Sequence, residues 1–143
     1  MAAVSGSFSG SIHAQSVILL NDEPNHSLGV AEVRGAQSSS DAKWNNSTIT
    51  YWGTTDMQGL EGVQRGYFLN DHGAAGRDRG TFEGNVSIEG DELVVEGKWQ
   101  FTGGDGQFAG ITGSGTFKTR LTSSTTVEGN WQGAYTLVEV AAR

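Results

Sequence analysis

The chain has 143 residues, among them 22 glycines, one proline and no cysteine, and its formal net charge is −7. The length predicts one domain, residues 1–143, and the lack of cysteine excludes a disulfide scaffold and a cysteine-based metal site. The acidic charge disfavours nucleic acid and anionic membrane as partners, and no apolar run reaches the roughly 18 residues of a membrane helix.

Short stretches in which apolar and polar residues alternate run along the whole chain, and no segment shows a helical stripe. A period of two is typical of antiparallel strands with one buried face. Gly90 and Asp91 predict a two-residue hairpin loop in which the glycine takes a positive φ. Residues 71–79 are polar and glycine-rich and predict a mobile surface loop. The eight predicted strands, in chain order, are residues 5–20, 26–37, 46–55, 60–70, 80–90, 92–102, 114–122 and 125–140.

Eight strands of this length, joined mostly by tight turns, predict an all-β fold. We expect a single eight-stranded antiparallel up-and-down β-barrel, because closure removes the exposed edges of the sheet. Glycines inside the strands fit the strong coiling of a small barrel.

The alternation also predicts which side chains face the interior of the barrel. An eight-stranded barrel is either filled by its own side chains or holds one small ligand, and the pattern leaves both alternatives open. Trp52, Phe68, Val94 and Val138 fall on the predicted outer face and suggest a subunit interface. The residues predicted to line a ligand-binding lumen are Val63, Tyr67, Trp99, Phe101, Phe117, Trp131 and Tyr135.

Two strands place charged residues on the otherwise apolar face. Glu61 and Arg65 lie in one of them and Glu32 in the other. A buried charge is costly unless it is paired, and a buried carboxyl can act as a general acid or base because its pKa is raised. Glu61, Arg65, Glu32 and Tyr51 are therefore the candidate catalytic residues: a carboxylate would move a proton, and Arg65 or Tyr51 would stabilise negative charge. Alternatively, these charges lie at strand ends, pair with one another or are turned outward by a bulge.

The remaining chemistry-bearing residues give only weak signals. His13, His26 and His72 are not at metal-ligand spacing, and His26 and His72 fall in predicted turns, where we expect them to be solvated. Residues 103–106 lack the Lys-Ser/Thr ending of a phosphate-binding loop. We therefore expect no metal and no cofactor. No secretory signal is visible, and with the lack of cysteine this predicts a cytoplasmic location.

Residues 101–115 follow the order Gly-Gly-x-Gly-x-Phe-x-Gly-x-x-Gly and resemble the allene oxide cyclase and dirigent barrels. Residues 28–35, and 49–53 followed by 59–66, resemble two further parts of those families, which also have bacterial relatives of unassigned function. The resemblance spans residues 28–120. It implies an eight-stranded barrel with a hydrophobic lumen that guides cyclisation or coupling of apolar substrates, and assembly as a trimer. Plant allene oxide cyclases carry a glutamate on the first strand, whereas residues 9–17 contain no carboxylate, so no catalytic residue is carried over.

Three functions follow from these observations. The first is a cofactor-free isomerase or cyclase that acts on a hydrophobic small molecule held near its reactive conformation. The second is a non-catalytic carrier of a hydrophobic ligand, which needs only the aromatic lumen. The third is a structural or interaction protein with a filled barrel. In each case we expect a homo-oligomer, with a trimer favoured over a dimer.

Overall fold

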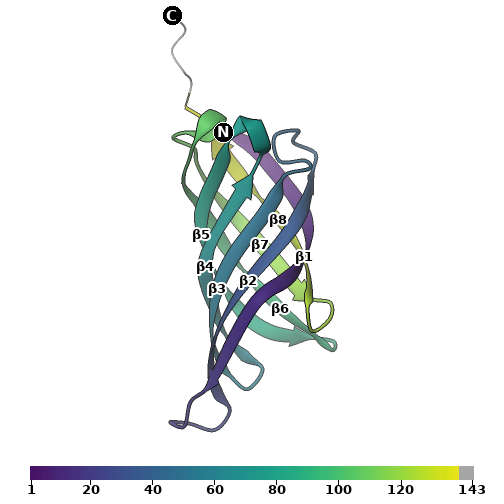
Figure 1. The fold of residues 1–143 in the computed structure, drawn as a ribbon, viewed down its shortest axis with the longest axis vertical. Helices are drawn as coiled ribbons and strands as arrows, with labels where there is room; N and C mark the ends of the chain where they lie inside the picture. The colour runs from purple at the N-terminus through teal and green to yellow at the C-terminus, as the bar shows by residue number, and fades with distance from the viewer. Residues whose placement is uncertain (139–143) are drawn as a thin grey trace, which may run out of the picture.

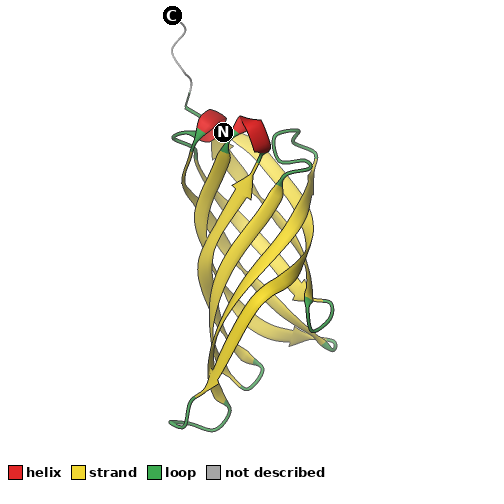
Figure 2. Cartoon of the chain, viewed as in Figure 1, coloured by secondary structure: helices red, strands yellow, loops and turns green. Residues whose placement is uncertain are grey.

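The computed structural model describes residues 1–138 and shows a closed barrel of eight antiparallel strands (Figure 1). Each strand pairs with its neighbours along the chain, and β8 closes the barrel onto β1, which confirms the predicted up-and-down barrel. Figure 2 shows that two short 3-10 turns lie at one end of the strands. The elements are β1 (Ala2–Leu19), β2 (His26–Ser39), β3 (Thr48–Gln58), β4 (Glu61–Asp71), η1 (Gly73–Ala75), β5 (Arg77–Glu89), β6 (Glu92–Gly104), η2 (Gly106–Phe108), β7 (Thr112–Leu121) and β8 (Thr126–Thr136).

Each predicted stretch overlaps one strand, and the boundaries differ where the pattern is weak. Strand β5 already begins at Arg77, so the surface loop predicted for residues 71–79 shrinks to the turn around η1. The two-residue loop between β5 and β6 is confirmed, and Gly90 has a φ of 62°. The last predicted stretch reached residue 140, but β8 ends at Thr136, and residues 139 and 140 lie outside the described residues.

The two ends of the barrel differ (Figure 1). The upper end carries η1, η2 and the connection between β2 and β3, whereas the lower end has only the other hairpin turns. Strand β8 pairs with the first half of β1 only, from Ala2 to Ser11. The second half of β1 pairs with β2 alone and forms part of the lower rim, where Val17 and Leu19 are 55% and 74% exposed. The lower end is therefore open to solvent on this side.

Aromatic rings fill much of the interior because glycines face them from neighbouring strands. Gly80 pairs with Phe68, and a Cβ atom on Gly80 would lie 2.4 Å from Cζ of that ring. Gly6 pairs with Trp131, and its Cβ atom would lie 2.5 Å from Cζ2 of the indole. Both separations are shorter than two carbon atoms tolerate. The high glycine content thus makes room for the large side chains of the core.

Candidate functional site

The connection between β2 and β3, residues 40–47, closes the upper end of the barrel, and we call it the plug. It holds Trp44, whose side chain is completely buried. The centroids of the Trp44 and Tyr135 rings are 4.8 Å apart, and Phe108 packs edge-on against the indole at 5.5 Å. The Tyr135 hydroxyl donates a 2.8 Å hydrogen bond to the Asp41 carboxylate. Burial, together with this carboxylate, raises the pKa of Tyr135 to about 12, so the hydroxyl stays protonated and the connection stays tied to β8.

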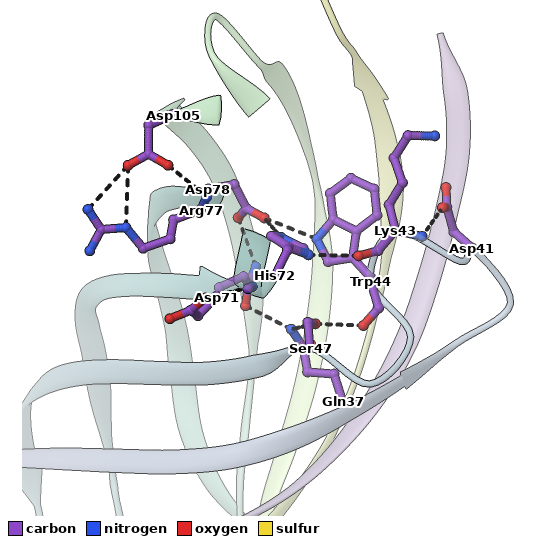
Figure 3. Close-up of polar contacts among 12 residues, drawn as sticks. Gln37, Asp41, Lys43, Trp44, Ser47, Asp71, His72, Arg77, Asp78 and Asp105 are labelled. Carbon is purple, nitrogen blue, oxygen red and sulfur yellow. Dashed lines mark hydrogen bonds and ion pairs between the residues drawn. The ribbon is translucent and has the colours of Figure 1, made fainter. Parts of the chain in front are cut away.

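Asp78 lies at the centre of a buried hydrogen-bond network beside this plug (Figure 3). Its carboxylate accepts hydrogen bonds from Asn70 Nδ2 at 2.8 Å and from Trp44 Nε1 at 3.2 Å. Nε2 of His72 lies 2.6 Å from the same carboxylate, and the two side chains are only 2% and 0% exposed. The expectation that His72 is solvated is therefore wrong, because its turn folds inward over the end of the barrel.

The partners of His72 determine where its hydrogens lie. Nδ1 is 2.7 Å from the backbone oxygen of Lys43, which can only accept, so Nδ1 carries a hydrogen. A single hydrogen joins Nε2 to the Asp78 carboxyl group across the 2.6 Å contact. The carboxyl oxygens also accept from Asn70 and Trp44. His72 and Asp78 therefore form a buried hydrogen-bonded pair.

The network continues from Asn70 down the inner wall of the barrel. Gln37 donates from Nε2 to Asn70 Oδ1 at 2.8 Å, and its Oε1 accepts from Trp131 Nε1 at 2.8 Å. Within the described part of the chain, every fully buried side-chain nitrogen or oxygen has a hydrogen-bond partner. A buried network whose polar atoms all have partners holds its members in place. Its role is to position the plug and the upper wall of the space below.

Below the plug, the barrel encloses a cavity of about 70 Å³. No charged side chain of the described residues lines it. A charged ligand would thus be buried without a counter-charge, which is strongly unfavourable. The cavity suits a neutral molecule. The aromatic side chains in its wall are Phe8, Trp44, Tyr51, Phe68, Phe82, Trp99, Phe101, Phe117 and Trp131.

Three polar side chains in the cavity wall stand apart from the network above. They are Tyr51 on β3, Gln64 on β4 and Thr119 on β7. Within residues 1–138, these three side chains take part in none of the side-chain hydrogen bonds. Because no fully buried polar side-chain atom there lacks a partner, their polar atoms are not fully buried. Burial raises the pKa of the Tyr51 hydroxyl far above its usual value, so the group remains a neutral hydrogen-bond donor. These side chains are the polar groups that a molecule in the cavity would meet.

Five of the predicted lumen residues lie inside the barrel. Trp99, Phe101, Phe117 and Trp131 line the cavity. Tyr135 is buried above it, against the plug. Strands β6, β7 and β8 have large apolar residues on one face and charged or amide residues on the other, so the inward face was clear from the sequence.

The inward placement of Val63 and Tyr67 is wrong. Both lie on the outer face of β4, 38% and 66% exposed. The inward positions of this strand hold Gln64, Gly66 and Phe68, followed by Asn70. In the sequence, two amides and a glycine resemble the solvent-facing side of a strand. In the structure, the amides line the cavity and the glycine allows β4 to approach β3 closely. A Cβ atom on Gly66 would lie 1.8 Å from a backbone oxygen of β3.

The charged catalytic candidates also lie on the outer surface. The side chains of Arg65 and its neighbour Glu83 are 73% and 68% exposed, and Glu61 is exposed next to the β3–β4 turn. The Glu32 carboxylate accepts a 2.7 Å hydrogen bond from Trp52 Nε1. That hydrogen bond holds the pKa of Glu32 below its usual value. The structure therefore does not bring Glu61, Arg65 or Glu32 together with Tyr51, which alone of the four lines the cavity.

Of the four residues predicted to form a subunit interface, two are exposed and two are buried. Trp52 and Val138 are exposed on the outside, at 38% and 63%. Phe68 lies inside the barrel, and Val94, which stands between Ser87 and Arg120 in the sheet, is 2% exposed. The outer face therefore offers a smaller apolar surface at these four positions than the sequence indicated.

No protein-family model matches the chain, and no curated protein matches it. Among the described residues, no helix has the length and apolar character to cross a membrane, and no three His, Cys, Asp or Glu side chains are grouped to hold a metal ion. Any functional assignment therefore depends on the cavity itself.

Proposed function

We propose that the chain binds a small, neutral, mainly apolar molecule in the barrel cavity and acts as a carrier or sensor of that molecule. The observation that carries the proposal is a cavity of about 70 Å³ with an aromatic wall and no charged lining residue. Ligand sites in proteins are typically apolar clefts with a few convergent polar groups. Tyr51, Gln64 and Thr119 are such groups here.

The volume limits the size of the ligand. A single water molecule needs roughly 10–15 Å³, and an engineered apolar cavity of about 150 Å³ admits benzene. A cavity of about 70 Å³ lies between these values, so a small ring or a short branched chain fits it with little adjustment of the wall. The open lower rim beside the second half of β1 is the route of entry that we propose.

Binding without chemistry is favoured over isomerisation or cyclisation. Proton transfer needs a donor and an acceptor near the substrate. Tyr51 is the one catalytic candidate in the cavity wall, and its raised pKa makes it a poor base. The carboxylates that would move a proton are on the outer surface. Self-association of the barrel remains a separate prediction.

The positions of the four tryptophans provide the test. Trp44, Trp99 and Trp131 line the cavity, whereas Trp52 lies on the outer face. On titration with cyclopentane, we expect saturable shifts of the indole N–H signals of Trp99 and Trp131 in ¹H–¹⁵N correlation spectra, with Trp52 unchanged. The variant Trp52→Phe assigns the control signal. No shift at all, or equal shifts of all four indoles, would contradict binding in the cavity.

A further inference from the structure

We infer that the cavity selects ligands carrying one hydrogen-bond acceptor, such as a ketone or ether oxygen, and that the Tyr51 hydroxyl donates to this acceptor. The inference depends on the proposed function, because it names the chemical class of the molecule that the cavity binds. The ligand class is thus a small neutral ring or branched chain with an acceptor oxygen.

The ring of Tyr51 is held in one orientation. It packs edge-on against Phe8, with centroids 5.9 Å apart and an interplanar angle of 72°, and against Phe82, at 5.5 Å and 85°. The residue is 8% exposed and lines the cavity. Because two aromatic neighbours restrain the ring, its hydroxyl cannot turn away to bulk water without repacking the core. A partner for this hydroxyl has to come from within the cavity.

The lack of a protein partner distinguishes Tyr51 from other polar aromatic groups of the interior. Trp99 donates from Nε1 to the backbone oxygen of Thr116 at 3.1 Å, and the Tyr135 hydroxyl donates to Asp41 at 2.8 Å. The Tyr51 hydroxyl forms no such bond within the described residues. Since every fully buried side-chain oxygen there has a partner, this hydroxyl is not fully buried and faces the cavity that Tyr51 lines. Tyrosine hydroxyls kept away from bulk water usually have a partner, so this group is free to bind one in the ligand.

The other two free polar groups extend the same site. Gln64 and Thr119 lie on β4 and β7, in different parts of the cavity wall. An amide and a threonine hydroxyl both donate and accept hydrogen bonds, whereas the neutral tyrosine hydroxyl is the strongest donor of the three. Burial keeps Tyr51 protonated, since it raises the pKa of the hydroxyl. The chemistry of the wall therefore matches an uncharged acceptor and not a carboxylate.

Cyclopentanone and cyclopentane provide a matched pair of probes, because they have nearly the same shape and differ in one carbonyl oxygen. We expect Tyr51→Phe to weaken cyclopentanone binding about tenfold, as the loss of one buried hydrogen bond does. Binding of cyclopentane should change by less than about twofold, since the ring of residue 51 is kept. Dissociation constants come from titrations followed by the Trp99 and Trp131 indole signals. Tyr67→Phe, which removes an outer hydroxyl at a 66% exposed position, should change neither affinity.

The outcomes separate this inference from the proposed function. Tyr51→Phe could weaken the binding of both probes equally, or leave the affinity for cyclopentanone unchanged. In either case the hydroxyl does not donate a hydrogen bond to the ligand's acceptor, and the inference is overturned. If the unaltered chain binds neither probe, the proposed binding function itself is overturned, and the inference with it. Selective loss of cyclopentanone binding in Tyr51→Phe, with cyclopentane retained, supports both.

Discussion

Replacing Asp78 with alanine is expected to lower the free energy of unfolding by about 3–5 kcal/mol, because each buried polar group left without a partner costs about 1–3 kcal/mol. The change leaves the His72 imidazole, the Trp44 indole N–H and the Asn70 amide without the partner they share. All three groups lie at the closed end of the barrel, so water cannot replace the carboxylate without opening the plug. Urea unfolding at pH 7, followed by circular dichroism, measures the loss.

Two control variants separate the effect of losing the buried hydrogen bonds from the effect of changing the net charge. Asp78→Asn keeps the shape and one acceptor oxygen, so we expect a smaller loss than for alanine. Asp91→Ala alters the net charge by the same amount in the exposed turn between β5 and β6, where surface substitutions usually change stability by less than about 0.5 kcal/mol. If Asp78→Ala lowers the free energy of unfolding by no more than Asp91→Ala does, the buried network does not stabilise the barrel in the way described.

The second large effect is expected from Trp44→Ala, which should also lower the free energy of unfolding by about 3–5 kcal/mol. Trp44 is completely buried, plugs the upper end and forms part of the cavity wall. Its removal leaves a hole among Tyr135, Phe108 and His72 that the surrounding strands cannot fill by small movements. Thermal unfolding and urea midpoints measure the effect.

Trp52→Ala is the matched control for this substitution. Trp52 lies on the outer face and makes one hydrogen bond, to Glu32, so we expect a loss of about 1 kcal/mol. Trp44→Phe keeps most of the ring and removes the indole N–H donor to Asp78, and should fall between the two. A Trp44→Ala protein as stable as Trp52→Ala would show that the plug is not part of the core.

The barrel could be predicted because strand and turn signals agree along the chain. In β6, Trp99 and Phe101 alternate with Lys98 and Gln100, and this contrast identifies the inner face. The hairpin at Gly90 is local, since a positive φ at a glycine between two strands does not depend on distant residues. Strand β4 lacks such a contrast, so the sequence pattern predicts the inner face for its outward side chains, such as Val63 and Tyr67.

The buried hydrogen-bond network around Asp78 could not be predicted from local patterns, because its members are polar or isolated residues from separate segments. Each of them looks like a surface residue in its own part of the sequence. They meet only because the register of β2 to β5 brings the upper ends of these strands beneath one connection. An isolated tryptophan in a polar connection was the one available signal. The members are Gln37, Trp44, Asn70, His72 and Asp78.

A crystal of the protein held under xenon pressure tests the central claim most directly, because xenon enters empty apolar cavities in proteins. We predict a bound xenon atom inside the barrel, against the rings of Tyr51, Phe82 and Trp131, which line the cavity of about 70 Å³. The surrounding side chains should keep their positions. A barrel whose interior is filled by its own side chains and takes up no xenon would contradict the proposal that this chain binds a ligand there.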